Sequence, residues 1–282
     1  MKLDLAPHIL KKILKETLLV AKGASEILLT YFHGETSLKN QSSNEDSPVT
    51  KADLAANVYI LERLQSIFGN DQCAYLSEEN DCGLEAFAQE WVWIIDPLDG
   101  TKDFLQKTNE FAVHIALTFQ GHPVVAVVAI PAEQKFYCAA KGMGSYFENA
   151  RGEVTYLQVS NKQALSDMTL VVSRNHRDER FQKLIEFLPL GQYSYMGSIG
   201  CKIAAIAMQE ADIYISLSGK TAPKDWDFAA PELVLTEAGG KFTYLDGSPI
   251  TYNRGDVSQW GVLIASNGIC HQQLLDKVKE EV

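Results

Sequence analysis

The stretch that most constrains this chain is residues 91–104, WVWIIDPLDGTKDF, because an unbroken apolar run ends in two aspartates within one tight turn. The apolar run predicts a buried strand over 91–96. A residue before proline is kept out of the helical region, and a glycine permits a positive φ, so the chain turns sharply after the strand. We therefore expect Asp96 and Asp99 on one small loop at the carboxyl end of a strand.

Two carboxylates in so small a loop need cations. At about 4–5 Å apart they repel by several kcal/mol at an intermediate effective dielectric constant. Mg²⁺ takes oxygen ligands and often combines one or two carboxylates with phosphate oxygens of a substrate. The backbone N–H groups of Gly100 and Thr101 would face the same point, where an anion can bind. The alternative is an ordinary turn after a strand, in which Thr101 caps a helix.

The charge balance limits the partners of the protein. Lys and Arg number 25 against 36 Asp and Glu, which gives a net charge of −11, and the chain has no basic tract. This composition argues against a nucleic-acid polymer or an anionic membrane as partner. A small phosphorylated substrate is compatible with it, provided that a cation lies between substrate and protein.

Cysteine usage and the first residues bear on the compartment. The five cysteines show no C-x-x-C spacing, which argues against a disulfide framework or a structural zinc site and for a reducing environment. The opening MKLDLAPHIL has an aspartate where a signal peptide would need its apolar core, and the longest apolar stretch, 124–130, is far too short to span a bilayer. We expect a cytoplasmic protein with no membrane span, and the sequence carries no signal for its oligomeric state.

Hydrophobic periodicity divides the chain into two parts. The first part begins with two amphipathic helices and continues as a mostly antiparallel sheet, with strands expected at 73–77, 91–96, 111–119, 123–130 and 135–140. The second part alternates strands and helices, typical of an α/β unit, with strands at 169–173, 193–196, 212–216, 241–245 and 261–266. Its helices are expected at 177–188, 198–210, 226–238 and 269–281. We expect an α+β part over 1–165 and an α/β part over 166–282.

The motif DPLDGT after a strand resembles the metal-binding signature of the inositol monophosphatase superfamily, the lithium-sensitive, Mg²⁺-dependent phosphomonoesterases. Three further stretches fit in the order that the family has them, namely SPVTKAD (47–53), LSEEN (76–80) and KDWDFAAPELVLTEAGG (224–240). Within the superfamily, these stretches together with VVSRNH and GSIGCKIAAIA are most similar to the CysQ-type 3′(2′),5′-bisphosphate nucleotidases. Those enzymes remove the 3′-phosphate of 3′-phosphoadenosine 5′-phosphate (PAP). The resemblance implies a layered αβαβα sandwich with the metals between the two parts.

The resemblance also implies a ligand set for two or three Mg²⁺ ions. Its members are Glu78, Asp96, the Leu98 carbonyl oxygen, Asp99 and Asp227. Adjacent residues on an extended chain point to opposite sides, so we expect Glu79 to face away from the site. Without the resemblance, the acidic loop at 78–80 reads as a solvated surface, and Asp227 as a common acidic residue at a helix start.

Three residues are expected to act on the attacking water. In the family, the aspartate that matches Asp53 hydrogen-bonds the threonine that matches Thr101, and this pair orients and deprotonates the water. Glu78 could help to position the same water. Thr50 and Asp53 also nearly form a capping box at a helix start, and both interpretations can hold at once.

The residues that would bind the rest of the substrate are less specific. The family pattern points to Gly100, Thr101, Ser173, Arg174, His176, Ser198, Lys202 and Lys224, with Lys220 as a further cation. Cationic donors suit phosphate, whereas the alternative for each of them is an ordinary solvated side chain. We expect Trp91, Trp93 and Phe104 in the core and not at the substrate.

Three rival functions are testable against the motifs. An inositol monophosphatase or broad sugar phosphatase would share all the metal motifs and differ only on the substrate side. A haloacid-dehalogenase-type hydrolase uses D-x-D spacing with an aspartate nucleophile, and the D-x-x-D spacing here argues against it. A metal-binding module without activity should lack a motif residue, and none is missing: Asp53, Glu78, Asp96, Asp99, Thr101 and Asp227 are all present.

Overall fold

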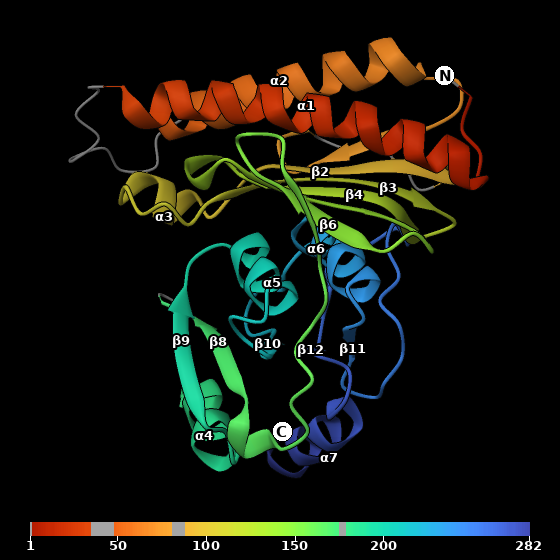
Figure 1. Ribbon diagram of the computed structural model, residues 1–282. Helices are drawn as coiled ribbons and strands as arrows, with labels where there is room; N and C mark the ends of the chain where they lie inside the picture. The colour runs from red at the N-terminus through yellow and green to blue at the C-terminus, as the bar shows by residue number, and fades with distance from the viewer. Residues whose placement is uncertain (1, 35–47, 81–87, 175–178) are drawn as a thin grey trace.

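The computed structural model describes residues 2–34, 48–80, 88–174 and 179–282, which form five layers (Figure 1). Two long helices cover one face of a seven-stranded sheet, two helices lie between that sheet and a five-stranded sheet, and two helices cover the far face of the second sheet. The αβαβα sandwich expected from the sequence is therefore confirmed.

The outer helical layer consists of α1 (Pro7–His33) and α2 (Pro48–Phe68). Proline at the first helical position starts α1, because its fixed φ suits a helix and its missing N–H costs no hydrogen bond there. Gly23 lets the two helices approach closely, since a Cβ at this position would lie 2.0 Å from the Tyr59 hydroxyl oxygen.

The seven-stranded sheet follows the order of the sequence. Its first two strands are parallel and every later pair is antiparallel. Its strands are β1 (Ala74–Ser77), β2 (Trp91–Asp99), β3 (Ala112–Phe119), β4 (His122–Ile130), β5 (Lys135–Ala140), β6 (Ser145–Glu148) and β7 (Val154–Tyr156). Helices cover both faces of β2 to β4, which explains why these strands read as continuous apolar runs. Trp93 and Phe104 are fully buried as expected, and Trp91 is half-buried against the same core.

The second sheet has the order β11-β12-β10-β8-β9. Strands β8, β9 and β10 are parallel, and β12 runs antiparallel to both of its neighbours. Its strands are β8 (Thr169–Ser173), β9 (Gln192–Met196), β10 (Ile213–Leu217), β11 (Lys241–Tyr244) and β12 (Val262–Ser266). The helices of this half are α4 (Glu179–Phe187), α5 (Ile199–Ala207), α6 (Asp225–Glu237) and α7 (His271–Glu281), with short turns η2 (Pro131–Glu133) and η3 (Leu165–Asp167) elsewhere.

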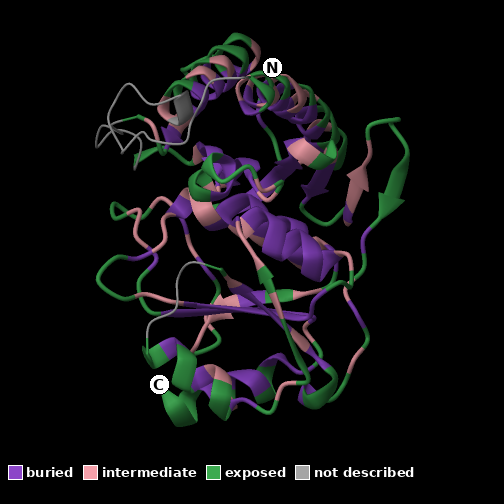
Figure 2. Cartoon of the chain, turned by 90° about the vertical axis from the view of Figure 1, so that its left-hand side faces the viewer, coloured by how far each residue is buried: buried purple, intermediate pink, exposed green. Residues whose placement is uncertain are grey.

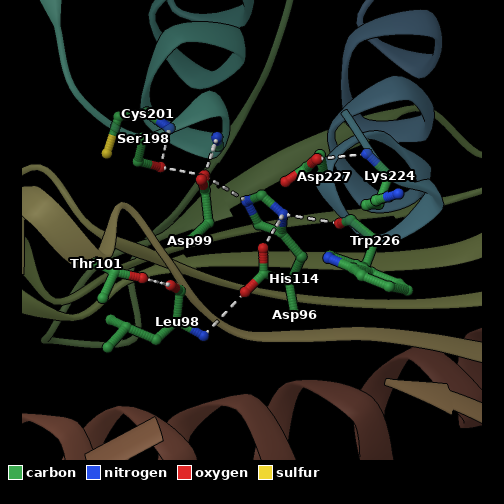
Figure 3. A network of polar contacts seen from close by, with 11 residues as sticks. Asp96, Leu98, Asp99, Thr101, His114, Ser198, Cys201, Lys224, Trp226 and Asp227 are labelled. Carbon is green, nitrogen blue, oxygen red and sulfur yellow. Dashed lines mark hydrogen bonds and ion pairs between the residues drawn. The ribbon is translucent and has the colours of Figure 1, made fainter. Parts of the chain in front are cut away.

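The middle layer is the most deeply buried part of the molecule. Figure 2 shows buried residues concentrated between the two sheets, where α5 and α6 lie. Eight of the nine residues of α5 are buried, including Lys202. Both helices begin beside the end of β2 (Figure 3), so the middle layer brings two helix N-termini to the turn that carries the paired aspartates.

The structure differs from the sequence-based expectation mainly in short elements. Strands β6 and β7 were not expected, and both are only three or four residues long. Strand β2 continues through Pro97 to Asp99, with an irregular pairing to β3 between Asp96 and Asp99. The five-residue helix α3 (Thr101–Leu105) follows directly.

Two further points concern the chain as a whole. We keep as a proposal the division into parts 1–165 and 166–282, which falls in η3, between the last strand of one sheet and the first strand of the other. Within the ranges given above, no helix combines the length and hydrophobicity needed to cross a membrane.

Candidate metal centre and substrate cavity

Asp96 and Asp99 lie together as the sequence predicts, although both belong to the end of β2 and not to a loop after it (Figure 3). Asp96 is 1% exposed, and its Oδ1 accepts a hydrogen bond from the Leu98 N–H at 3.0 Å. Gly100 has a φ of 90°, and a Cβ there would lie 2.9 Å from the Glu110 carbonyl oxygen. Only glycine therefore fits the position that ends the turn.

Asp99 has three partners in the protein. Its Oδ2 accepts hydrogen bonds from the Ser198 hydroxyl and, at 2.8 Å, from the Gly200 N–H, both at the start of α5. His114 Nε2 lies 3.2 Å from the same oxygen. Burial raises the pKa of Asp99, but the His114 imidazole and the donors of α5 outweigh it and lower this pKa below its ordinary value. Asp99 is thus held as an anion in a fixed orientation.

Asp227 approaches from the first turn of α6. Its Oδ2 accepts a hydrogen bond from the Lys224 N–H at 2.6 Å. Burial, followed by the negative charge of Asp99, raises the pKa of Asp227 to about 6. Asp227 therefore caps the N-terminus of α6 and also lies beside the paired aspartates.

Three carboxylates meet at one point between the layers. One oxygen each of Asp96, Asp99 and Asp227 can be chosen so that all three atoms lie within 4.8 Å of one another. A divalent ion that holds oxygens at about 2.0–2.5 Å can reach oxygens about 4–5 Å apart. The donors are all oxygen, the set that hard cations such as Mg²⁺ prefer. These residues therefore fit a divalent cation.

Glu78 belongs to the same cluster. The residue as a whole is exposed, but its carboxyl group lies beside that of Asp96. Desolvation, then the charges of Asp227, Glu79 and Asp99, raise the pKa of Glu78 to about 7. Burial, followed by the charges of Glu78, Asp99, Asp227 and Asp53, raises the pKa of Asp96 well above its ordinary value. Neighbouring carboxylates repel one another unless one binds a proton, and a cation can take the place of that proton.

The expectation that Glu79 faces away is wrong. Glu79 lies beside Asp53, and burial together with the charges of Glu79 and Glu78 raises the pKa of Asp53 to about 8. The physical reason is local, because β1 ends at Ser77 and the following residues form a turn. Alternation of side chains holds only along an extended strand.

The expected hydrogen bond between Asp53 and Thr101 is not formed. The Thr101 hydroxyl donates to the Leu98 carbonyl oxygen at 3.3 Å. Asp53 Oδ1 is buried and has no hydrogen-bond partner among the residues that the structure describes. Asp53 and Thr101 thus lie at the same centre but turn to different neighbours.

His114 is a site residue that the sequence analysis missed. It lies on β3 directly opposite Asp96 in the strand register and is fully buried. Its Nδ1 lies 3.1 Å from the Trp226 carbonyl oxygen and 4.0 Å from Asp96 Oδ2. Burial lowers the pKa of His114, but Asp99 outweighs burial and raises it above the ordinary value. The signal that could have found it is one histidine within the apolar run FAVHIALTF.

A cavity of about 750 Å³ opens beside the carboxylates. Asp99 and Asp227 lie on its wall, and Phe181, Tyr214 and Leu217 add apolar surface. Of the residues expected at the substrate, those that line it are Gly100, Thr101, Ser173, Arg174, Ser198 and Lys202, and Lys220 lies there too. His176 lies outside the described residues.

Several of these side chains are already engaged by the protein. Ser198 Oγ binds Asp99 and caps α5. The Arg174 guanidinium lies 2.5 Å from a Glu110 oxygen, and the Lys202 ammonium donates to the Gly197 carbonyl oxygen. Lys224 is not on the cavity wall, because its Nζ donates to Ser258 Oγ at 2.8 Å.

Comparison with known families and proteins gives one consistent result. The model of the "Inositol monophosphatase family" matches residues 10–282. The 3′(2′),5′-bisphosphate nucleotidase CysQ of Aggregatibacter actinomycetemcomitans is 31% identical over 251 residues, which cover 88% of this chain and 90% of that protein. The protein of the same name from Salmonella typhimurium is 31% identical over 242 residues, covering 85% of this chain and 94% of the relative.

Solved structures share the fold. An inositol monophosphatase from Anabaena superposes with a TM-score of 0.75 at 26% identity and covers 97% of both chains. CysQ from Bacteroides thetaiotaomicron superposes with a TM-score of 0.78 at 24% identity, covering 91% of this chain and 97% of that one. The layered sandwich expected from the motifs is thus the fold of these proteins as well.

Proposed function

The chain belongs to the inositol monophosphatase family, and we propose that it is a Mg²⁺-dependent phosphomonoesterase that converts PAP to AMP and phosphate. The observation that carries this proposal is the cluster of Asp96, Asp99 and Asp227 beside a cavity of about 750 Å³. Three carboxylates this close together need a cation to balance their charge. Relatives named as 3′(2′),5′-bisphosphate nucleotidases, 31% identical over most of their length, support the choice of substrate.

We assign the metal ligands as Glu78, Asp96, Asp99, Asp227 and the Leu98 carbonyl oxygen, for two or three Mg²⁺ ions. Bound cations would supply Lewis-acid polarisation of the phosphoryl group and a more acidic water. The chain's own part is to fix the oxygens. Leu98 N–H holds Asp96, α5 holds Asp99, and the N-terminal turn of α6 holds Asp227.

Asp53, Glu78 and Thr101 are proposed to handle the proton of the attacking water. Asp53 Oδ1 is a buried acceptor without a partner in the described chain, so it is free to accept a hydrogen bond or a proton from a water. A relay through Thr101 requires its hydroxyl to exchange the Leu98 oxygen for a water or for Asp53. That rotation involves a single side chain on the exposed start of α3.

The cavity dimensions support a nucleotide-sized substrate. Pockets of about 300–1,000 Å³ bind small molecules of this size. Phe181 and Tyr214 provide aromatic surface for a base, while Lys202, Lys220 and Arg174 provide positive charge for a second phosphate. Ser173, Ser198, Gly100 and Thr101 complete the proposed substrate wall, and Lys224 and His176 stay proposals from the family pattern alone.

An inositol monophosphatase or a broad sugar phosphatase is the second candidate. The observation in its favour is the 26% identity to the Anabaena inositol monophosphatase over almost the whole chain. The metal site would be the same, so only the substrate side separates the two candidates.

We propose a cytoplasmic location. Among the described cysteines, Cys73, Cys138, Cys201 and Cys270 are free and buried, an arrangement that suits a reducing compartment.

The test is phosphate release from PAP and from inositol 1-phosphate, measured side by side with Mg²⁺, with EDTA and with Mg²⁺ plus Li⁺. The proposal predicts fast release from PAP that EDTA abolishes and Li⁺ inhibits, with little release from the inositol ester. Faster release from the inositol ester would establish the second candidate. No release from either ester with Mg²⁺ would contradict both.

A further inference from the structure

We propose that Glu110 is a positioning residue for the metal centre, because it fixes the start of α5, from which Asp99 is held. Glu110 lies between α3 and β3, in the segment that joins the turn after β2 to the next strand. The inference rests on the proposed function in one respect, since it treats Asp99 as a metal ligand.

Glu110 binds the start of α5 through two groups. Its side-chain Oε2 accepts a hydrogen bond from the Gly197 N–H at 2.6 Å. Its main-chain carbonyl oxygen accepts one from the Ser198 N–H at 3.3 Å. Two consecutive peptide N–H groups before α5 are therefore anchored to one residue of the first half of the chain.

The same segment is held from its other side. The Lys202 ammonium, buried one turn into α5, donates to the Gly197 carbonyl oxygen. Gly197 also packs against Asp103 so closely that a Cβ would lie 2.3 Å from the Asp103 carboxyl group. The Gly197 peptide is thus fixed by a carboxylate on its N–H and by an ammonium on its carbonyl.

The fixed segment presents two donors to Asp99. Ser198 Oγ and the Gly200 N–H both donate to Asp99 Oδ2. Gly200 packs closely against β3, because a Cβ there would lie 2.3 Å from His114 Nε2. A displacement of this segment would therefore move or release the Asp99 carboxylate.

Arg174 holds Glu110 in turn. Its guanidinium lies 2.5 Å from Glu110 Oε1 and 3.5 Å from Asp103 Oδ1. The two oxygens of Glu110 are therefore divided between Arg174 and the Gly197 N–H. Arg174 also lies on the cavity wall. Its pairing with Glu110 lets it help to position the start of α5 even when no substrate is bound.

The expected effect is on metal affinity. Changing a residue that orients a metal ligand typically costs about 10–100-fold in affinity or activity. Because Glu110 acts through one further contact, we expect about 3–10-fold weaker binding of Mn²⁺, used as a probe for Mg²⁺, when Glu110 is changed.

The experiment is calorimetric titration of the metal-free full-length protein with Mn²⁺, without substrate. Glu110→Ala removes both side-chain contacts, and Glu110→Gln keeps the length of the side chain but places an amide against Arg174 or Gly197. The matched control is Glu133→Gln, which breaks the exposed ion pair with Lys135 (2.7 Å) far from the centre. We expect weaker binding in both Glu110 variants and in Arg174→Ala, and no change in the control.

A double-mutant cycle separates positioning from general damage. Glu110→Ala is combined with Ser198→Ala, which removes a donor to Asp99 directly. If Glu110 acts through this segment, the two losses of Mn²⁺ affinity are less than additive. Should Glu110→Ala fail to fold, Glu110→Gln and its double variant decide the question.

The inference is overturned if the Glu110 variants bind Mn²⁺ as tightly as the unchanged protein, whether or not their melting temperature falls or their KM for PAP rises. Fully additive losses overturn it as well. Its failure is distinguishable from failure of the proposed function, which would appear as an unchanged protein that binds Mn²⁺ but releases no phosphate from either ester. An unchanged protein that binds no Mn²⁺ would contradict both.

Discussion

Asp212 and the carboxylates around Asp96 both include buried aspartate, and the two places differ in what surrounds the carboxylate. Asp212, at the start of β10, is fully buried, and its Oδ1 accepts from Ser160 Oγ. Its Oδ2 accepts from Lys162 Nζ at 2.7 Å and from the Thr169 N–H at 2.8 Å. Both carboxylate oxygens of Asp212 therefore accept hydrogen bonds from the protein, and one of the donors is a cation.

The carboxylates around Asp96 are surrounded mostly by one another. Glu78 lies beside Asp96, and Glu79 lies beside Asp53. The histidine opposite Asp96 is the nearest cationic group that the described contacts provide. A buried charge without a partner is costly, so the difference between the two places indicates that Asp212 serves stability and the Asp96 cluster serves a bound cation.

The largest expected effect is the loss of activity when Asp99, in the Asp96 cluster, is changed. Asp99→Asn should lower kcat/KM for PAP by about 10³-fold, because it removes a metal ligand worth several kcal/mol in the transition state. The fold should survive, since the amide can still accept from Ser198 and Gly200. Steady-state kinetics and circular dichroism check both statements, and near-unchanged activity would refute the assignment of Asp99.

Asp212→Asn should lower stability and leave activity almost unchanged. Loss of the anionic acceptor for Lys162, Ser160 and the Thr169 N–H should cost about 3 kcal/mol of unfolding free energy. Because the site lies apart from the cavity, kcat/KM at 25 °C should change less than twofold. Urea unfolding and kinetics on one preparation measure the two quantities, and a large loss of activity without a loss of stability would break the comparison.

Glu232 on α6 is a buried carboxyl group that, among the described residues, has neither the donors of Asp212 nor the neighbouring carboxylates of the Asp96 cluster. Its Oε2 is buried without a partner in the described chain, and burial raises its pKa to about 8. The folded state binds this proton more tightly than the unfolded state, so this group makes unfolding free energy fall as pH rises from about 4.5 to 8.

Glu232→Gln should therefore remove part of the pH dependence of stability. We expect the variant to gain roughly 2 kcal/mol over the unchanged protein at pH 9 and little at pH 5. Chemical unfolding at both values tests this, with Glu133→Gln as an exposed control. An equal effect at both values would show that Glu232 does not carry the titration.

The smallest expected effect is the relief of repulsion in the cluster. Without metal at pH 9, Asp96→Asn should raise unfolding free energy by about 1 kcal/mol, because one charge is removed from a group of neighbouring carboxylates. With Mg²⁺ the order should reverse, since binding stabilises the unchanged protein by about 2.7 kcal/mol at 100 times the Kd. Melting curves with EDTA and with Mg²⁺ test the reversal, which no purely structural role of Asp96 would produce.

The parts of the site that sequence could predict are those set by local chain geometry. The strand, the residue before Pro97 and the glycine at position 100 fix the turn by themselves, so the meeting of Asp96 and Asp99 was readable. The helices and long strands could also be predicted, because their apolar periodicity extends over many residues.

The missed parts depend on contacts between distant segments or on the end of a strand. His114 acquires its place only through the pairing of β3 with β2. Glu79 turns to Asp53 because β1 stops one residue before the acidic pair. Lys224 turns to Ser258, which belongs to a loop 34 residues further along the chain. Apart from the single histidine within an apolar run at His114, these contacts leave no pattern in the residues nearby.

The central claim is that the carboxylates at the end of β2 hold divalent cations. The most direct test is a crystal structure of the protein grown with Mn²⁺, with diffraction recorded above the manganese absorption edge. The account predicts an anomalous peak among Asp96, Asp99 and Asp227, with carboxylate oxygens at about 2.0–2.4 Å from it. Well-ordered carboxylates with no anomalous peak among them, in crystals that contain Mn²⁺, would contradict the account.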